Sequence, residues 1–501
     1  MRRVQQVVGR SRFLWIVLAI GSLAACPLPA SAQNEVYERC KQYTGERANP
    51  DRAIEDCTAA IESDLLSDAQ LVDALNRRGP AYSIKGEYDH AIQDFDEAIK
   101  IDPRLANSFV NRGLAYFYKG EPDRAIQDFD QAIRLQPDNV GALIDRGNAF
   151  VAKGEYDRAI GDLNEAIRLE PNAADAINDR GLALRFKGDY DRAIDDFNHA
   201  IQLQPRYAMA FYNRGAAFAL KTQYELAIRD FDQAILLQPD LAEAFVGRGN
   251  VNRSKGDFDR ALPDYDEAIR LQPQNPSALY NRGLAFADKG DDNGAIRDYD
   301  EAIELKPSYV DAFYARGLAY AHKGEYDRAI QDYGHAIRLR PDYGAAFTNR
   351  GRAHFYGGQF PAAQPDFERA IQLNSAVTYN TIWLYLAQSR VYKDARSELS
   401  KRSSQFNLTV WPEQVISFYL GKMTQESVLA AAKNADPKKD REQNCEVYFY
   451  LGEYAMITGK QEEAGRLFQQ SVDTGVTNFP EYTGAQAELK RLTAAKTHSN
   501  R

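Results

Sequence analysis

Arginine and aspartate recur at fixed places along the 501-residue sequence, and their pairing is the clearest chemistry that it offers. A guanidinium can form two parallel hydrogen bonds with one carboxylate, so paired columns of these residues predict structural ion pairs. Examples are Arg112–Asp128, Arg214–Asp230 and Arg282–Asp298. The alternative is a basic ladder that binds an acidic partner. The arginines, each 34 residues from the next, are Arg78, Arg112, Arg146, Arg180, Arg214, Arg248, Arg282, Arg316 and Arg350. The aspartates, with the same period, are Asp94, Asp128, Asp162, Asp196, Asp230, Asp264, Asp298, Asp332 and Asp366.

Other side chains that support catalysis or metal binding form no recognisable motif. The six histidines lie singly, without the His-Glu-x-x-His spacing of a zinc protease. There is no Gly-x-Ser-x-Gly motif, and no phosphate-binding loop interrupts the regular glycines. The net charge of −9 comes from interspersed acidic and basic residues, whereas nucleic-acid binding favours a basic face. We therefore expect no enzyme, no metal site, no cofactor and no nucleic-acid partner.

The elements that position the two columns are pairs of helices. Residues 111–137 read NRGLAYFYKGEPDRAIQDFDQAIRLQP, and the pattern returns 34 residues later. Apolar residues have helical spacing before Gly120, a glycine suits the end of that helix, and Pro122 suits the first turn of a second. Gly113 is small where the antiparallel helices come close, and Phe129 fills the space beside it. One such hairpin cannot bury its apolar stripe alone, so neighbouring hairpins must stack.

This unit resembles the tetratricopeptide repeat (TPR) family, in the variant NRG…G-x-Y-D-x-A-I-x-D-[FY]. The resemblance covers residues 38–374, and some eight positions of the unit recur nine times. It implies an all-α fold, a solenoid of helical hairpins in a right-handed superhelix. Nine regular repeats are expected in residues 72–374, after a degenerate first repeat in residues 34–71.

The first 32 residues have the pattern of an export signal peptide. Arginines lie near the start, residues 13–20 are apolar, and Ala30-Ser31-Ala32 offers small residues before a cut. The apolar run is too short for a stable membrane helix. We expect simple cleavage and a periplasmic protein. The alternative is an outer-membrane lipoprotein, because residues 23–26 (LAAC) resemble a lipobox in which Cys26 would be lipidated.

Export to an oxidising compartment makes the remaining cysteines informative. Residues 51–57 read DRAIEDC and match D-R-A-I-x-D-F of the regular units, so Cys57 takes the place of the second-helix aromatic. Cys40 falls just before the glycine position of the first helix. Because these positions face each other across a hairpin, we expect a Cys40–Cys57 disulfide; the alternative is two buried free thiols. Cys445 has no evident partner.

After residue 374 the period decays. We expect a degenerate helical region in residues 375–444, a restored hairpin with a capping helix in 445–492, and a disordered tail in 493–501. The segments IWLYLAQ, FYLG, YFYLG and NFPEYTGAQAEL resemble the C-terminal part of NlpI-type cell-envelope lipoproteins, over about 110 residues. That resemblance implies a dimeric TPR adaptor for envelope proteases and peptidoglycan enzymes. This chain has about twice as many repeats, so partner identity is not carried over.

The TPR resemblance implies that partners bind on a concave face lined by first helices. We expect inward positions three residues before and four or five residues after each repeat glycine. Most candidates are apolar or aromatic, which favours an extended or helical peptide with apolar anchors. The alternative for each residue is packing between hairpins. The candidates are Val110, Phe117, Tyr118, Phe186, Tyr212, Leu220, Tyr280, Tyr314 and His322.

These observations predict a non-enzymatic scaffold or adaptor of the bacterial cell envelope that docks partner peptides or proteins in the TPR groove. Its partners would be envelope proteins, with proteases or peptidoglycan enzymes implied by the resemblance, and a second copy of the chain. The alternative is a mainly structural envelope protein that self-assembles by forming dimers.

Overall fold

The computed structural model describes residues 37–42, 49–63, 66–392 and 394–499. The expected signal peptide and Cys26 lie outside these residues. Within them the regular structure is helical and no strand occurs. The chain divides into two compact units, one ending at Pro205 and the other beginning at Arg206, which are described separately.

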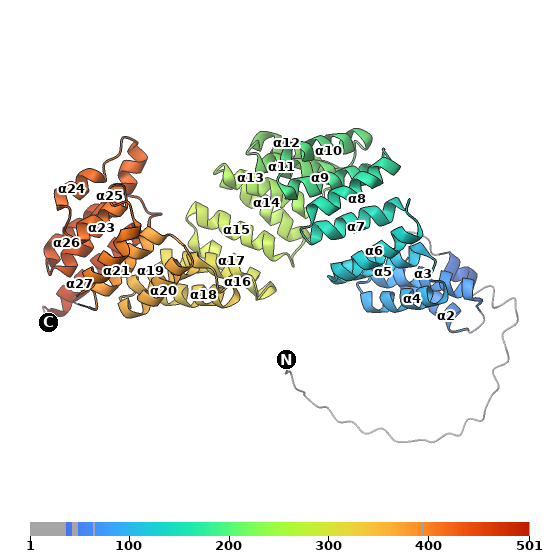
Figure 1. The fold of residues 1–501 in the computed structure, drawn as a ribbon, viewed down its shortest axis with the longest axis horizontal. Helices are drawn as coiled ribbons and strands as arrows, with labels where there is room; N and C mark the ends of the chain where they lie inside the picture. Colours follow the sequence, from blue (N-terminus) through green and yellow to red (C-terminus); the bar gives the residue numbers. More distant parts are fainter. Residues whose placement is uncertain (1–36, 43–48, 64–65, 393, 500–501) are drawn as a thin grey trace, which may run out of the picture. The chain divides into compact units, whose positions relative to one another are not determined.

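The first unit is built from antiparallel helix pairs that follow one another in chain order (Figure 1). A short helical segment at residues 37–41 precedes them. The helices are α2 (Pro50–Ile61), α3 (Asp68–Ile84), α4 (Tyr88–Ile101), α5 (Ala106–Lys119), α6 (Pro122–Leu135), α7 (Val140–Ala152), α8 (Tyr156–Leu169), α9 (Ala174–Lys187) and α10 (Tyr190–Leu203).

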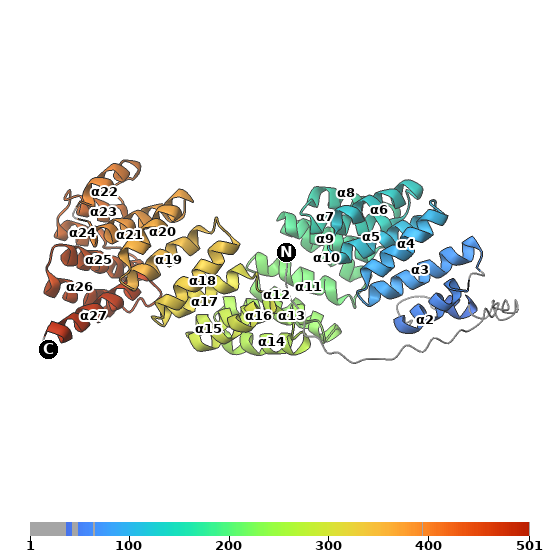
Figure 2. The same ribbon diagram turned by 90° about the horizontal axis from the view of Figure 1, so that it is seen from below.

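The second unit continues with five similar hairpins and then a less regular C-terminal part (Figure 2). The hairpin helices are α11 (Ala208–Leu220), α12 (Tyr224–Leu237), α13 (Ala242–Ser254), α14 (Phe258–Leu271), α15 (Pro276–Lys289), α16 (Asp292–Leu305), α17 (Val310–His322), α18 (Tyr326–Leu339), α19 (Gly344–Tyr356) and α20 (Phe360–Gln372). The C-terminal part contains α21 (Val377–Ser389), α22 (Arg396–Arg402), η1 (Ser403–Gln405), α23 (Glu413–Tyr419), α24 (Gln425–Ala431), α25 (Pro437–Ile457), α26 (Gln461–Asp473) and α27 (Pro480–Ser499).

Each regular hairpin has the same local design. In the α5–α6 pair, the first helix ends at Gly120, whose φ of 87° is the left-handed conformation that glycine adopts without steric cost. The second helix buries the ring of Phe129 completely. That ring lies directly over Gly113, where an added Cβ would be 2.6 Å from Cε1. The hairpins therefore depend on a small residue in the first helix and an aromatic or leucine in the second. The predicted all-α solenoid of helical hairpins is confirmed.

Three helix boundaries differ from those expected. Helix α3 begins at Asp68, because Ser67 and Gln70 form a capping box that starts it early. Helix α25 begins at Pro437, where the Asp436 side chain accepts from the first backbone amides. Helix α27 continues to Ser499, across residues expected to be disordered. Its earlier turns are packed on the protein, and extending an existing helix is far easier than starting one.

The last helix turns back onto the array. Helix α27 packs on α26 and α25 and also reaches α19, far earlier in the sequence. Gly484 permits this approach, since a Cβ there would lie 2.7 Å from Phe449 and 3.2 Å from Tyr356. None of the described helices combines the length and the apolar composition that crossing a membrane requires.

Candidate functional site

A groove of about 1230 Å³ lies in the first unit, along the first helices α3 and α5. The start of α2 and the turn between α4 and α5 complete its walls. Apolar side chains such as Val72 and Ile84 alternate with amide and charged groups. The polar lining residues include Asp73, Asn76, Arg77, Asn107, Ser108 and Asn111.

The amides of the groove fall into two groups. Asn76 is held in place, because its Nδ2 donates to Ser108 Oγ at 2.9 Å and Ser108 Oγ donates back to Asn76 Oδ1 at 3.1 Å. Asn107 is exposed and Asn111 half-buried, and neither makes a side-chain hydrogen bond among the described residues. A carboxamide carries both donors and an acceptor, as a peptide bond does. The groove can therefore pair with the backbone of an extended segment while Val72 and Ile84 contact its apolar side chains.

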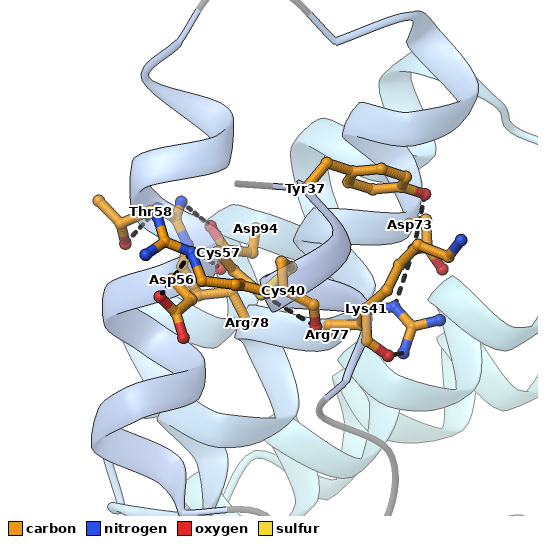
Figure 3. Close-up of a disulfide and its surroundings, with 11 residues drawn as sticks. Tyr37, Cys40, Lys41, Asp56, Cys57, Thr58, Asp73, Arg77, Arg78 and Asp94 are labelled. Carbon is orange, nitrogen blue, oxygen red and sulfur yellow. Dashed lines mark hydrogen bonds and ion pairs between the residues drawn. A yellow bond between two sulfur atoms is a disulfide. The ribbon is translucent and has the colours of Figure 1, made fainter. Parts of the chain in front are cut away.

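Asp73 and Arg77, which we call the charged rim of the groove, form hydrogen bonds with the segment of residues 37–41 (Figure 3). Asp73 Oδ2 accepts from the Tyr37 hydroxyl at 3.0 Å and from Arg77 Nε at 2.8 Å. Arg77 Nη1 also donates to the backbone oxygen of Lys41 at 3.2 Å. Burial, reinforced by the hydrogen bond to Asp73, raises the pKa of Tyr37 to about 12. The side chains of Asp73 and Arg77 are thus held in place by Tyr37 and Lys41, which do not line the groove.

The segment carrying Tyr37 and Lys41 is linked to α2 by a disulfide between Cys40 and Cys57, the pair expected from the sequence. Figure 3 shows both cysteines between Asp56 on one side and Asp73 and Arg77 on the other. Both cysteines are buried, and they pack with Ala60 and Ala74. Cys57 stands where the regular hairpins bury an aromatic ring or, in one case, Leu163, so the disulfide takes the place of that side chain.

None of the nine groove candidates from the sequence lines this groove. The candidates five residues after a glycine lie at the hairpin ends of their first helices and are mostly exposed, with exposed fractions of 62% for Tyr118, 51% for Phe186 and 54% for Leu220. The Tyr118 ring stacks on Tyr88 at 6.4 Å between centroids. His322, also in this column, lies 3.6 Å from an Asp292 carboxylate oxygen.

The candidates three residues before a glycine are half-buried and pack both within their own hairpin and against the next one. They are Val110, Tyr212, Tyr280 and Tyr314; Phe117, four residues after a glycine, is also half-buried. The Tyr212 ring lies 5.9 Å from Phe231, and Tyr280 lies 5.9 Å from Tyr299. These residues therefore contribute to packing.

Two of these tyrosines belong to a larger cluster in the second unit, which we call the tyrosine strip: Tyr280, Tyr309, Tyr314 and Tyr343. Ring centroids are 5.1 Å apart in the Tyr280–Tyr309 pair and 4.9 Å apart in the Tyr314–Tyr343 pair. Burial raises the pKa of Tyr280 and of Tyr343 to about 12 each. All four rings are half-buried and keep their hydroxyls protonated at neutral pH, so the strip offers aromatic surface with hydrogen-bond donors.

The sequence analysis missed the groove residues although their columns carried a signal. Asn76 lies three residues before Gly79 and Ile84 lies five after it, in the same columns as the candidates but one repeat earlier than the first of them. Asn111 lies two residues before Gly113, in a column that was not considered. Extending the same columns to the first regular repeat would have found part of this surface.

The arginine and aspartate columns form a continuous set of ion pairs. Arg112 donates from Nε and Nη2 to both carboxylate oxygens of Asp128, at 2.8 and 2.6 Å. Each of the other eight arginines likewise donates to the aspartate that lies sixteen residues later in the same hairpin. Arg282 also donates to Asp266 in the preceding hairpin, at 2.7 Å. Burial raises the pKa of Asp128 although Arg112 opposes this. The guanidiniums are thus engaged within the protein, which favours the structural interpretation over a ladder for an acidic ligand.

The C-terminal part packs on α19, the last of the regular first helices. Tyr356, five residues after Gly351, is buried beneath α27 and donates from its hydroxyl to the Pro480 carbonyl at 2.7 Å. Nearby, the buried Glu446 accepts from Tyr379 OH at 3.0 Å and from Trp411 Nε1 at 2.6 Å. Burial, then the charge of Glu481, raises the pKa of Glu446 to about 8. We assign these groups to the packing of α25 and α27.

Comparisons with known proteins agree with the repeat. Family models described as TPR repeat match residues 79–120, 181–222, 249–290 and 283–324. Models described as tetratricopeptide repeat match residues 110–174, 348–399 and 310–343. The Lipoprotein NlpI homolog of Haemophilus influenzae is 28% identical over 126 residues, which are 25% of this chain and 40% of that protein.

Two solved structures give the scale of the structural likeness. A tetratricopeptide repeat protein from Parabacteroides merdae is 18% identical, with 49% of this chain and 97% of that chain covered and a TM-score of 0.40. YrrB, described as a TPR protein with an unusual peptide-binding site, is 26% identical, with 38% of this chain and 97% of that chain covered and a TM-score of 0.29.

Proposed function

The chain belongs to the tetratricopeptide repeat family, and from that premise we propose that it is a non-enzymatic adaptor of the bacterial cell envelope. In this proposal it binds partner peptides or proteins along its first helices. TPR proteins are protein-interaction scaffolds. What we propose beyond that role is the binding site, the cellular compartment and the kind of segment that is bound.

The observation that carries the proposal is the groove along α3 and α5. Its volume of about 1230 Å³ suits a peptide segment rather than a single side chain. Asn107 and Asn111 supply amide groups for a peptide backbone, and Val72 and Ile84 supply apolar contacts. An extended segment with apolar side chains fits this combination better than a small polar metabolite does.

The tyrosine strip supports a second contact region in the other unit. Tyrosine side chains provide a large contact area at a low entropic cost, because they have few rotatable bonds. In this proposal Tyr280 and Tyr314 contact a partner with the faces that packing leaves accessible.

Two observations support the envelope as the compartment. The Cys40–Cys57 disulfide suits an oxidising environment. The similarity to the Lipoprotein NlpI homolog is a second support, although the matched region is less than half of that protein. Proteases and peptidoglycan enzymes of the envelope are the partners that we would test first.

Site-specific photo-crosslinking tests the groove. A benzophenone amino acid at Asn107, which is exposed and lines the groove, should capture specific envelope proteins. The matched control is the same probe at Gln93, an exposed residue of α4 outside the groove lining. Crosslinks of equal pattern and yield from both positions would contradict the proposal, as would the absence of any crosslink at Asn107 in envelope extract.

Self-assembly is a second candidate, because α12 in the second unit exposes large apolar side chains. Leu236 is 73% exposed and Leu226 is 40% exposed. Surface leucines in such a position favour association between copies. Sedimentation of the full chain and of Leu236→Lys tests this: a dimer that dissociates in the variant supports the self-assembling protein, and an unchanged monomer argues against it.

A further inference from the structure

Among the described residues, the segment of residues 37–41 buries Tyr37 and Cys40 and is joined to the rest of the first unit by a small set of polar contacts. The five described helical residues would not form a stable helix by themselves. Cys40 provides a covalent link to Cys57 on α2, and Arg39 lies 3.8 Å from Asp56 but is about half exposed. Two further polar attachments join Tyr37 to Asp73 and Lys41 to Arg77. The disulfide is therefore the strongest restraint on this segment.

Those two polar attachments end on residues of the groove. Asp73 and Arg77 lie one turn apart on α3, and both line the groove. The Tyr37 hydroxyl fixes one carboxylate oxygen of Asp73, and the Lys41 carbonyl fixes one arm of Arg77. The segment thus contacts both charged residues, while none of residues 37–41 lines the groove.

We propose that the Cys40–Cys57 disulfide couples the redox state of the chain to binding in the groove. This proposal rests on the proposed function in one respect: it assumes that the groove binds partners. In the oxidised chain the segment holds Asp73 and Arg77 in one arrangement, which is prepared for a ligand. In the reduced chain the segment detaches, the two side chains gain freedom, and binding weakens because ordering them again costs conformational entropy.

The redox step needs a dithiol reductant. One thiolate of the dithiol attacks a sulfur of the disulfide, and the mixed disulfide is then resolved by the second thiolate. Two electrons pass from the dithiol to the protein, the Cys40–Cys57 bond breaks, and two protons complete the thiols. Since neither cysteine is exposed, the segment must lift before the reductant can reach the bond. Reduction and release of the rim are therefore linked.

Carboxylate footprinting of the full chain tests the structural half of the proposal. Carbodiimide and glycinamide label accessible carboxylates, and mass spectrometry measures the yield at Asp73. We expect this yield to rise several-fold after treatment with dithiothreitol and in Cys40→Ser/Cys57→Ser. It should rise less in Tyr37→Phe, which keeps the disulfide and loses only the hydroxyl. Cys445→Ser, which removes a buried free thiol of the second unit, is the matched control and should change nothing at Asp73.

Crosslinking from Asn107 tests the functional half with the same proteins. A several-fold lower yield of partner in the reduced chain and in the double serine variant supports redox control. An unchanged labelling yield at Asp73 overturns the coupling, and a raised Asp73 yield with unchanged crosslinking overturns the control of binding. A lack of crosslinks in every form counts against the proposed function, and the footprinting alone then decides whether the disulfide holds the rim. Hydrogen exchange in α7 and α8 should stay native-like in all variants, because repeat hairpins depend chiefly on their neighbours.

Discussion

The ring of Tyr299 lies against the backbone of Gly283, so that a Cβ built on the glycine would be 2.6 Å from Cε1 of the ring. Tyr299 is 1% exposed and has no room to move outward. Equivalent contacts occur in other hairpins, including Gly113 with Phe129 and Gly317 with Tyr333. The spacing between the two helices of a hairpin is therefore set by the absence of one side chain.

Replacing this glycine should destabilise the hairpin. Gly283→Ala forces the Tyr299 ring or the α15 backbone to shift, and such overpacking typically costs about 1–3 kcal/mol. We expect the loss of stability to appear as faster hydrogen exchange in α15 and α16 and as a lower denaturant midpoint of unfolding. The matched control is Gly161→Ala, an exposed position in α8 where a Cβ meets nothing within 4 Å. There the substitution should stabilise by roughly 0.5–1 kcal/mol, since alanine favours helix. Equal effects at both positions would contradict the packing argument.

The ion-pair columns should matter more than surface pairs do. Arg282→Met leaves Asp298, which is 5% exposed, without its two guanidinium bonds. Removing one partner of a buried pair costs about 3–5 kcal/mol, and the partial exposure of Arg282 should place the loss in the lower part of that range. Arg270→Met, which breaks an exposed pair with Glu267, is the control and should leave the unfolding midpoint nearly unchanged. A small effect of Arg282→Met would favour the alternative in which the column serves a ligand.

Much of the fold was predictable because the same contact is repeated. The 34-residue period places a glycine, an aromatic or leucine and an Arg–Asp pair in equivalent positions of every regular hairpin, so Gly113, Phe129 and Arg112 could be interpreted without a structure. The Cys40–Cys57 disulfide was predictable for the same reason, since Cys57 stands in the aromatic position. These features depend on contacts within one hairpin or between neighbours.

The packing of the C-terminal part and the burial of the tyrosine strip were not predictable in this way. Tyr356 donates to the carbonyl of Pro480, 124 residues away, and no period relates those positions. The burial of Tyr280 and Tyr314 follows from neighbouring tyrosines in the turns before α17 and α19, which the column analysis ignored. Such relationships arise from how helices and turns outside the repeated columns pack, so a column of equivalent residues does not reveal them.

Stability of the C-terminal part should fall as the pH rises from mildly acidic to about 8. Glu446 has its pKa raised from 4.5 to about 8 in the folded chain, so between these values the folded state holds a proton that the unfolded state has lost. Its contribution is full below pH 4.5 and disappears as the pH reaches about 8. Glu446→Gln should flatten this part of the profile of unfolding temperature against pH, and the exposed Glu301→Gln should not. A wild-type profile that rises over the same range would refute the assignment.

The tyrosine strip should contribute to both packing and binding. Tyr280→Ala removes a ring that contacts Tyr299 and Tyr309, and truncation of a half-buried ring should cost somewhat less than the roughly 3–5 kcal/mol of a fully buried one. Tyr280→Phe keeps the ring and should keep the unfolding midpoint. If the hydroxyl contacts a partner, the phenylalanine variant weakens capture in a pull-down from envelope extract. Unchanged capture by the phenylalanine variant would assign the hydroxyl no role in binding.

Filling the groove should abolish capture without unfolding the chain. Asn107→Trp places a large ring in the groove from an exposed position of α5, so it blocks a peptide and disturbs no packed contact. We expect partner capture to fall at least tenfold, equivalent to about 1.4 kcal/mol of binding free energy. Gln127→Trp, on the exposed face of α6, is the matched control and should bind as the wild type does. Circular dichroism and the unfolding midpoint should be the same for both variants. Wild-type capture by a folded Asn107→Trp chain would show that partners do not use this groove, and the tyrosine strip would then be the surface to test.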